Sequence, residues 1–208
     1  MGYRLNVTDA PVHFCKVRVV TAQMPQLLRS DARDNRDRVL AAARELFAER
    51  GLDVTMRDIA RRAGVGPATL YRRFPTKRDI VEAAFHEEVR TCRQIVEDGC
   101  DDPDPWRGFC SVIDKISVLN VGNQGFVTAF TGTPSDTDIL AAHRTSVLKD
   151  LSALTRRAKV AGTLRSDFVI NDLVLVLLAG RGLASLPPAE RQSAARRFAT
   201  LAIDAFRA

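Results

Sequence analysis

Apolar side chains recur every three or four positions along most of this chain, which is the spacing of residues on one face of an α-helix. The first such stripe follows Asp34 and Asn35, either of which can cap a helix, and it ends at Gly51, a residue type that often terminates one. The pattern therefore predicts an all-α fold whose first helix lies between Asn35 and Gly51. The stripe consists of Val39, Leu40, Ala43, Leu46 and Phe47.

Two short helices joined by a tight turn are predicted next. Thr55 and Asp58 have the spacing of a capping box, in which each side chain bonds to the other residue's backbone N–H at a helix start. Gly64-Val65-Gly66 then interrupts the pattern, and Pro67 suits the first position of another helix. Two helices around such a turn form a helix-turn-helix. Its expected inward side chains are Ile59, Ala60, Ala63, Leu70 and Phe74.

A longer helix is predicted from Thr76 to near Gly99, and helical spacing continues to the C-terminus. Asp104 and Pro105 predict the start of the following helix, because Asp caps well and Pro fits the first position. The further segments expected to be helical are Trp106 to near Val121, Phe126–Phe130, Asp136–Ala161, Asn171–Ala184 and Pro188–Arg207.

The first residues of the chain do not share this pattern. Residues 12–20, VHFCKVRVV, alternate weakly like a β-strand, but the sequence holds no second strand candidate with which they could pair. We therefore expect residues 1–32 to be a loose arm, with a true start at Met24 as the alternative.

Positive charge is concentrated around the predicted helix-turn-helix. The whole chain has a formal net charge of +6. Residues 55–78 contain seven cations against one acid, whereas residues 79–104 contain nine acids against two arginines. The basic charge is thus a patch, which favours an anionic partner there and not over the whole surface.

Three functional classes find little support in the sequence. The phosphate-binding glycine motifs and the zinc-protease and serine-hydrolase motifs are absent, so we expect no enzyme and no cofactor. The longest apolar run is too short to span a bilayer, and the N-terminal residues lack the uninterrupted apolar stretch of a signal peptide, so we expect a cytoplasmic protein with no membrane partner. The cysteines lack metal-site spacing and indicate reduced thiols, with a redox sensor as the unsupported alternative. They are Cys15, Cys92, Cys100 and Cys110.

The helix that begins at Pro67 has an exposed face suited to reading DNA. If Leu70 and Phe74 point inward, then Ala68, Thr69 and Arg72 lie on the opposite side, with Tyr71 and Arg73 at the flanks. A helix fits the major groove, where arginine pairs with guanine and a threonine methyl meets the thymine methyl. Base reading is therefore available to Thr69, Arg72 and Arg73. The alternative is an ordinary solvated helix surface.

Phosphate binding is indicated at the start of the next helix. Lys77 and Arg78 lie in a first turn, where the helix dipole favours acids, so another anion is expected nearby. A DNA phosphate there would accept hydrogen bonds from the free backbone N–H groups and from Lys77. Thr55, Arg57 and the Tyr71 hydroxyl would hold the backbone on the other side.

Residues 36–92 resemble the DNA-binding domain of the tetracycline-repressor-like (TetR) transcriptional regulators. The resemblance is carried by RVLAAARELFAERG and by TMRDIARRAGVGPATLYRRFPTKRDI, with the pattern T-x-x-x-I-A, A-G-V, L-Y-x-x-F and a lysine three residues after the Phe. Gly66 replaces a frequent Ser, which weakens the cap, and Arg73 replaces a frequent His or Tyr, which affects the operator sequence. The resemblance implies DNA contacts from Thr55, Arg57, Pro67, Ala68, Thr69, Tyr71, Arg72, Arg73 and Lys77.

The resemblance also implies a division of the chain and a partner. Residues 33–93 would form the DNA-binding domain, and residues 94–208 would bind a small-molecule effector and dimerise. The helix over Asn171–Ala184 is apolar on every side, so it must be buried all round. Together with Pro188–Arg207 it would form a homodimer interface, as the last two helices do in that family. The alternative is that both helices pack only within one subunit.

A ligand pocket is expected between the two ends of the chain, where the family often has one. The alternative is that these aromatic side chains are plain core. The expected function is a repressor that a small-molecule effector releases from a palindromic operator, with a non-specific nucleoid protein or a regulator without ligand response as alternatives. The candidate pocket residues are Trp106, Phe109, Phe126, Phe130, Leu140 and His143.

Overall fold

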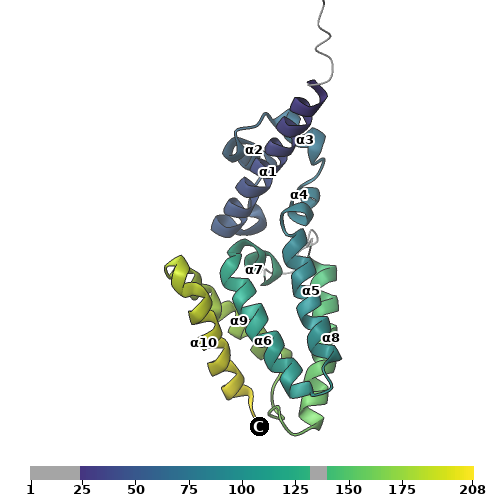
Figure 1. The fold of residues 1–208 in the computed structure, drawn as a ribbon, viewed down its shortest axis with the longest axis vertical. Helices are drawn as coiled ribbons and strands as arrows, with labels where there is room; N and C mark the ends of the chain where they lie inside the picture. The colour runs from purple at the N-terminus through teal and green to yellow at the C-terminus, as the bar shows by residue number, and fades with distance from the viewer. Residues whose placement is uncertain (1–23, 132–139) are drawn as a thin grey trace, which may run out of the picture. The chain divides into compact units, whose positions relative to one another are not determined.

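The computed structural model describes residues 24–131 and 140–208, with side chains from residue 33 onward. The chain divides into two units, residues 1–34 and 35–208. In the described ranges, all regular structure is helical apart from one isolated bridge between Leu164 and Arg207 (Figure 1). This confirms the all-α prediction. The strand-like residues 12–20 lie outside the described part.

The predicted helix-turn-helix is present, but the first helix starts earlier than expected. It passes through Asp34 and Asn35, so neither residue caps it. Pro25 lies in its first turn, where the missing N–H of proline does little harm. Asp34 and Asn35 are residue types that can cap a helix, but they do not mark its start here, because no neighbouring residue interrupts the helix at that point. The elements are α1 (Met24–Arg50), the 3₁₀ turn η1 (Gly51–Asp53), α2 (Met56–Ala63) and α3 (Pro67–Arg73).

The long helix predicted after Thr76 is two helices, α4 (Lys77–Ala84) and α5 (His86–Asp101). They meet at Phe85, whose backbone leaves the helical region at φ −112° and ψ 14°. The Phe85 side chain is fully buried, and its ring centroid lies 5.7 Å from that of Phe47 and 5.9 Å from that of Phe126. Since no Pro or Gly stands at this point, packing against these rings accounts for a break that local sequence does not signal.

Gly99 does not end its helix, contrary to the sequence prediction, because α5 continues to Asp101. Its role is to let α5 approach α6 (Pro105–Gly122) closely. A Cβ on Gly99 would lie 3.0 Å from the carbonyl oxygen of Gly108 and would also collide with Val112. Gly99 is thus a contact point between helices, a use of glycine that sequence alone does not separate from a helix stop.

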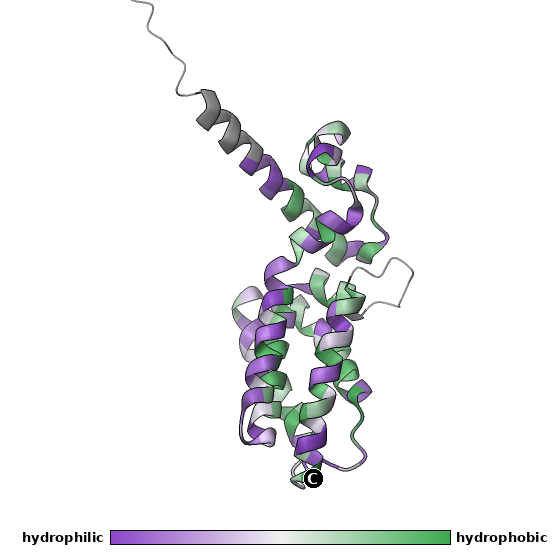
Figure 2. Cartoon of the chain, turned by 90° about the vertical axis from the view of Figure 1, so that its right-hand side faces the viewer, coloured by the Kyte–Doolittle hydropathy of each residue, from purple (hydrophilic) through white to green (hydrophobic). Residues whose placement is uncertain are grey.

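The remaining helices pack into a bundle. α5, α6 and α8 run side by side, and α10 lies along α6 (Figure 1). The green, apolar sides of these helices face one another, while their purple, hydrophilic sides face the solvent (Figure 2). The predicted start of one helix at Asp136 lies outside the described residues. The elements are α7 (Gln124–Thr131), α8 (Ala141–Val160), α9 (Ile170–Gly180), the 3₁₀ turn η2 (Arg181–Ser185) and α10 (Pro188–Phe206).

Candidate nucleic-acid interface and ligand cavity

The turn between α2 and α3 is built by local chemistry that the sequence signals directly. The hydroxyl of Thr55 accepts from the Asp58 N–H at 3.2 Å, and the Asp58 carboxylate accepts from the Thr55 N–H at 3.3 Å. The Thr55 hydroxyl also donates to the Asp58 carboxylate at 2.7 Å, and this side-chain hydrogen bond contributes most to holding the pKa of Asp58 below its usual value. Gly64 takes the left-handed conformation at φ 65°, which ends α2. Pro67 then opens α3.

The two faces of α3 are divided as predicted. Leu70 and Phe74 are buried against the domain core. Tyr71, a large side chain, is nevertheless 47% exposed, and Arg72 and Arg73 are exposed beside it. Pro67 and Ala68 are exposed and Thr69 is half-buried. The predicted DNA-reading side chains therefore share one open surface.

The cations of the basic patch fall into two groups. Arg62 bridges α2 to α1 through Glu45 at 3.1 Å and Glu49 at 2.9 Å, and these hydrogen bonds raise its pKa, with Glu49 contributing most. Arg61 pairs with Asp58, and Arg78 pairs with Glu82.

The arginines of the second group form no such ion pairs within the described ranges. Arg57, Arg72 and Arg73 make no side-chain hydrogen bond or ion pair to any residue in the described ranges. All three are exposed. The guanidiniums that folding does not use are thus three of those predicted to touch DNA, which favours an anionic partner over an internal role.

The ammonium of Lys77, predicted to bind a DNA phosphate, is not freely solvated. It donates to the carbonyl oxygen of Leu52 in η1, the 3₁₀ turn that follows α1. Partial burial lowers its pKa. Because an ammonium has three donors, Lys77 could keep this bond and offer its remaining N–H groups to a phosphate oxygen. Thr55 is similarly occupied by its capping box, so its hydroxyl would serve DNA only as a shared partner.

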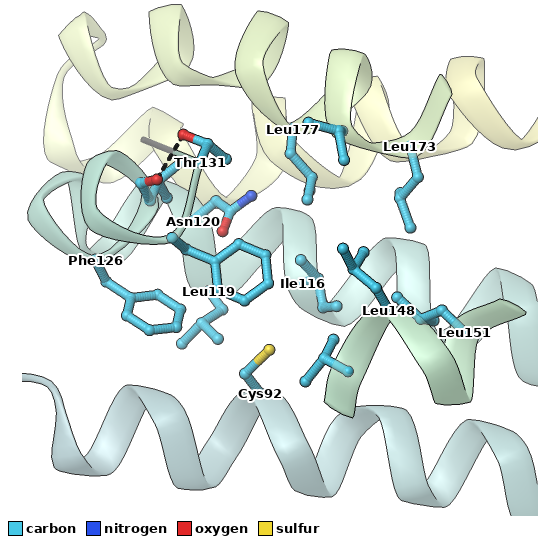
Figure 3. A pocket seen from close by; sticks show the side chains of 14 residues that line it. Cys92, Ile116, Leu119, Asn120, Phe126, Thr131, Leu148, Leu151, Leu173 and Leu177 are labelled. Carbon is cyan, nitrogen blue, oxygen red and sulfur yellow. Dashed lines mark hydrogen bonds between the residues drawn. The ribbon is translucent and has the colours of Figure 1, made fainter. Parts of the chain in front are cut away.

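An apolar cavity lies among α5, α6, α7, α8 and α9 (Figure 3). Its volume is about 20 Å³, which is room for little more than one water molecule. Leucine, isoleucine, valine and phenylalanine side chains form most of the wall, and Asn120, Thr131 and Cys92 are its polar or sulfur-bearing members. Burial raises the pKa of the Cys92 thiol to about 11, so that thiol is protonated at neutral pH.

Two of the six predicted pocket residues, Phe126 and Phe130, line this cavity. Trp106 and Phe109 lie elsewhere: Phe109 packs against Phe168 and Phe206, with ring centroids 5.6 and 6.1 Å away. Trp106 stacks on Phe109 and lies beneath the Arg207 guanidinium. These aromatic side chains are core, as the alternative interpretation held.

Leu140 and His143 are buried, but neither is part of the cavity wall. The imidazole of His143 lies 5.7 Å from the Phe130 ring and 6.4 Å from the Phe126 ring, measured between centroids. Neither ring nitrogen has a hydrogen-bond partner among the residues that the structure describes. Burial and, less strongly, Arg93 lower the pKa of His143, so its imidazole is neutral.

Sequence reasoning missed Asn120 and Cys92. Asn120 is a polar residue within the apolar face of α6, and that interruption is the signal that was available in the sequence. Cys92 gave no such signal, because a cysteine in a helical stripe is typical core.

One face of α9 and α10 is apolar and exposed. Leu173 and Leu177 of α9 are buried, but Leu175 is 56% exposed and Leu201 of α10 is 52% exposed. Within one chain, therefore, α9 is buried only on the side that carries Leu173 and Leu177. The prediction that it is buried on every side includes a second copy, so it stays a prediction.

Two other site classes are not found. No helix in residues 24–131 or 140–208 is long and apolar enough to cross a bilayer. Among the residues whose side chains are described, no group of three or more His, Cys, Asp or Glu side chains could hold a metal ion.

Residues 39–84 match the family model for bacterial regulatory proteins of the tetR family. An uncharacterized HTH-type transcriptional regulator of Mycobacterium tuberculosis is 27% identical over 157 residues, which is 73% of this chain and 80% of that protein. A TetR transcriptional regulator of Streptomyces coelicolor is 32% identical, with 83% of this chain and 98% of that chain covered and a TM-score of 0.49. The transcriptional regulator FadR from Bacillus subtilis, crystallised in complex with stearoyl-CoA, is 17% identical, with coverage of 80% and 96% and a TM-score of 0.54.

Proposed function

The chain belongs to the tetR family of bacterial regulatory proteins, which are DNA-binding transcriptional regulators and not enzymes, and on that premise we propose that it is a homodimeric repressor released from its operator by a small apolar effector. The observation that carries the proposal is α7, which lines the cavity with one face and packs against α1 of the DNA-binding helices with another. Its proposed place of action is the cytoplasm, where bacterial DNA lies.

DNA recognition is proposed for the open face of α3. Arg72 and Arg73 would contact base edges in the major groove together with Thr69, since arginine can bond two acceptors of guanine. Arg57, Tyr71 and the helix starts at α2 and α4 would hold phosphates. The support is that these arginines are exposed and have no partner within the described ranges.

Dimerisation is proposed through α9 and α10. These two neighbouring helices expose apolar surface at Leu175, Leu178 and Leu201. Contiguous exposed apolar surface marks sites of protein interaction. A second copy would bury the same side chains by two-fold symmetry. Two α3 helices could then read two half-sites of one palindromic operator.

Ligand binding is proposed at the cavity. Its wall is apolar and lies between helices, which is the usual setting for a small-molecule site in a helical bundle. The B. subtilis relative of the same fold is titled as a complex with stearoyl-CoA, which supports an apolar ligand here. Since the cavity holds about 20 Å³, a ligand must separate its walls in order to enter.

If a ligand moved these walls apart, α7 would transmit the movement to the DNA-binding helices. Phe126 and Phe130 of α7 face the cavity. Gly125, on the same helix, lies so close to α1 that a Cβ there would be 3.1 Å from the Arg44 carbonyl oxygen and 3.3 Å from the Ala48 nitrogen. A shift of α7 away from the cavity would therefore press on α1, and the ligand-bound form would differ in DNA affinity.

The test is release of bound DNA. Small apolar compounds are titrated against the complex of the protein with its selected operator duplex, followed by fluorescence anisotropy. The proposal expects compounds that bind the protein to lower operator affinity by roughly 5- to 150-fold. If every compound that binds the cavity leaves operator affinity unchanged, the protein is a regulator without ligand response.

A further inference from the structure

Asn120 presents an unpaired carboxamide to an otherwise apolar cavity. Figure 3 shows its side chain, from α6, directed among Leu177, Ile116 and the phenylalanine rings. The residue is 9% exposed, and its carboxamide makes no side-chain hydrogen bond to any residue of the described ranges. Its polar atoms are not among the buried, unsatisfied ones of those ranges, so they stay within reach of a water molecule or of a polar ligand group in the cavity.

The other polar groups of the wall do not provide that partner. The Thr131 hydroxyl donates to the Val127 carbonyl oxygen at 2.7 Å, and this contact is drawn in Figure 3. The Cys92 thiol is a weak hydrogen-bonding group. Asn120 is therefore the side chain of the wall that offers both a strong donor and a strong acceptor.

Asn120 also lines a second cavity next to the first. This smaller cavity among α6, α9, η2 and α10 shares Asn120 and Leu177 with the first. Ser117, one turn earlier on α6, lines that second cavity and is buried with no side-chain hydrogen bond in the described ranges. An apolar chain in the first cavity would thus place a polar end group between Asn120 and Ser117.

Charge is absent from both walls. No Asp, Glu, Lys or Arg side chain lines either cavity, so an ion would lose its hydration without gaining a partner. The carboxamide bonds best to a group that both accepts from its NH₂ and donates to its carbonyl oxygen.

We propose that the cavity takes an uncharged aliphatic ligand with one amide-like end group, and that Asn120 is the residue that selects this group. The inference rests on the ligand-responsive function proposed above and specifies the chemistry of its effector. The apolar walls would hold the chain, and the paired hydrogen bonds at Asn120 would separate this ligand from acids and simple hydrocarbons of equal length.

The experiment compares three ligands with a ten-carbon acyl chain at pH 8 by isothermal titration calorimetry. Decanamide donates and accepts, methyl decanoate only accepts, and decanoate carries a negative charge. For the wild-type protein we expect decanamide to bind roughly 10-fold or more tightly than methyl decanoate, and decanoate to bind least. This ranking does not require any variant to fold.

The variant is Asn120→Leu, which keeps the number and branching of the side-chain heavy atoms and removes both hydrogen-bonding groups. It should bind decanamide and methyl decanoate equally, with a loss of about 10-fold or more for decanamide alone. The matched control is Gln94→Leu, which removes an exposed amide on α5 away from both cavities and should keep the wild-type ranking. Equal binding of the two neutral ligands to the wild type, an unchanged preference in Asn120→Leu, or no binding of decanamide would each overturn the inference.

Operator release separates this inference from the function on which it rests. If all three compounds release the operator equally, the ligand-responsive function stands and the role of Asn120 is refuted. If decanamide binds through Asn120 and operator affinity does not change, the role of Asn120 stands and the ligand-released repressor is refuted.

Discussion

The exposed face of α3 and the wall of the cavity use their side chains in opposite ways. Arg72 and Arg73 on α3 are exposed and contribute no internal ion pair in the described ranges. Phe126 and Leu151 in the cavity wall are buried and form part of the continuous core. The α3 face can therefore change its partner without changing the fold, whereas the cavity wall cannot change its ligand without changing the packing.

Arg72→Ala should have the largest effect, and that effect should be confined to DNA binding. We expect a loss of about 1–3 kcal/mol in specific operator binding, because a guanidinium that pairs with a base edge is removed. Stability should not change, since Arg72 has no partner in the described ranges. Anisotropy and thermal unfolding measure the two quantities.

Arg90→Ala is the matched control for that change. It removes another exposed arginine, but one on α5 that pairs with Glu87. Operator affinity should stay near the wild-type value. An equal loss in both variants would mean that α3 contributes only general positive charge.

Cys92→Phe should affect the cavity and leave the DNA-binding face unchanged. The larger ring would fill the cavity and exclude a ligand, so release by an effector should be lost while operator binding in its absence persists. Overpacking should lower the free energy of unfolding by about 1–3 kcal/mol. Ligand titration of the operator complex and chemical denaturation test both expectations, and retained release would contradict them.

Leu175→Lys should act at the proposed dimer surface and leave each subunit folded. Leu175 is exposed in one chain, so its replacement affects packing only if a second copy covers it. We expect weaker dimerisation, by about 2 kcal/mol, as a charge enters an apolar contact. Analytical ultracentrifugation measures this, and an unchanged assembly state would place the dimer contact elsewhere.

His143→Leu should have the smallest effect and a distinct pH dependence. Removing an imidazole with two unpaired nitrogens should stabilise the fold by about 1 kcal/mol at pH 8. The pKa of His143 is lowered in the fold, so the unfolded chain binds the proton more readily, and stability falls as pH drops below about 6.5. The variant should lose less stability between pH 7 and 5. Denaturation at both pH values tests this, and an identical decline in wild type and variant would refute it.

Local chemistry explains why the DNA-binding helices could be predicted and the cavity could not. The capping box at Thr55 and the left-handed Gly64 act within a few residues, so the sequence signals them directly. The break at Phe85 depends on Phe47 and Phe126, which lie far from it in the chain.

The same limit applies to the pocket prediction. Helical spacing identified Trp106 and Phe109 as inward-facing, which is correct, but it could not tell which inward side chains surround empty space. That depends on how several helices pack together. The pairing of Arg62 with α1 likewise could not be read from a count of charges.

Sequence-specific reading by α3 is tested by selection of bound duplexes from a random-sequence DNA pool at near-physiological salt, followed by anisotropy on the selected sequence. We predict enrichment of an inverted repeat whose half-site centres lie about 34–36 Å apart, or a multiple of that distance, bound at least about 10³-fold more tightly than a scrambled duplex. Uniform recovery of unrelated sequences, with equal affinity for both duplexes at every salt concentration, would contradict sequence-specific reading by α3 and favour a non-specific DNA-binding protein.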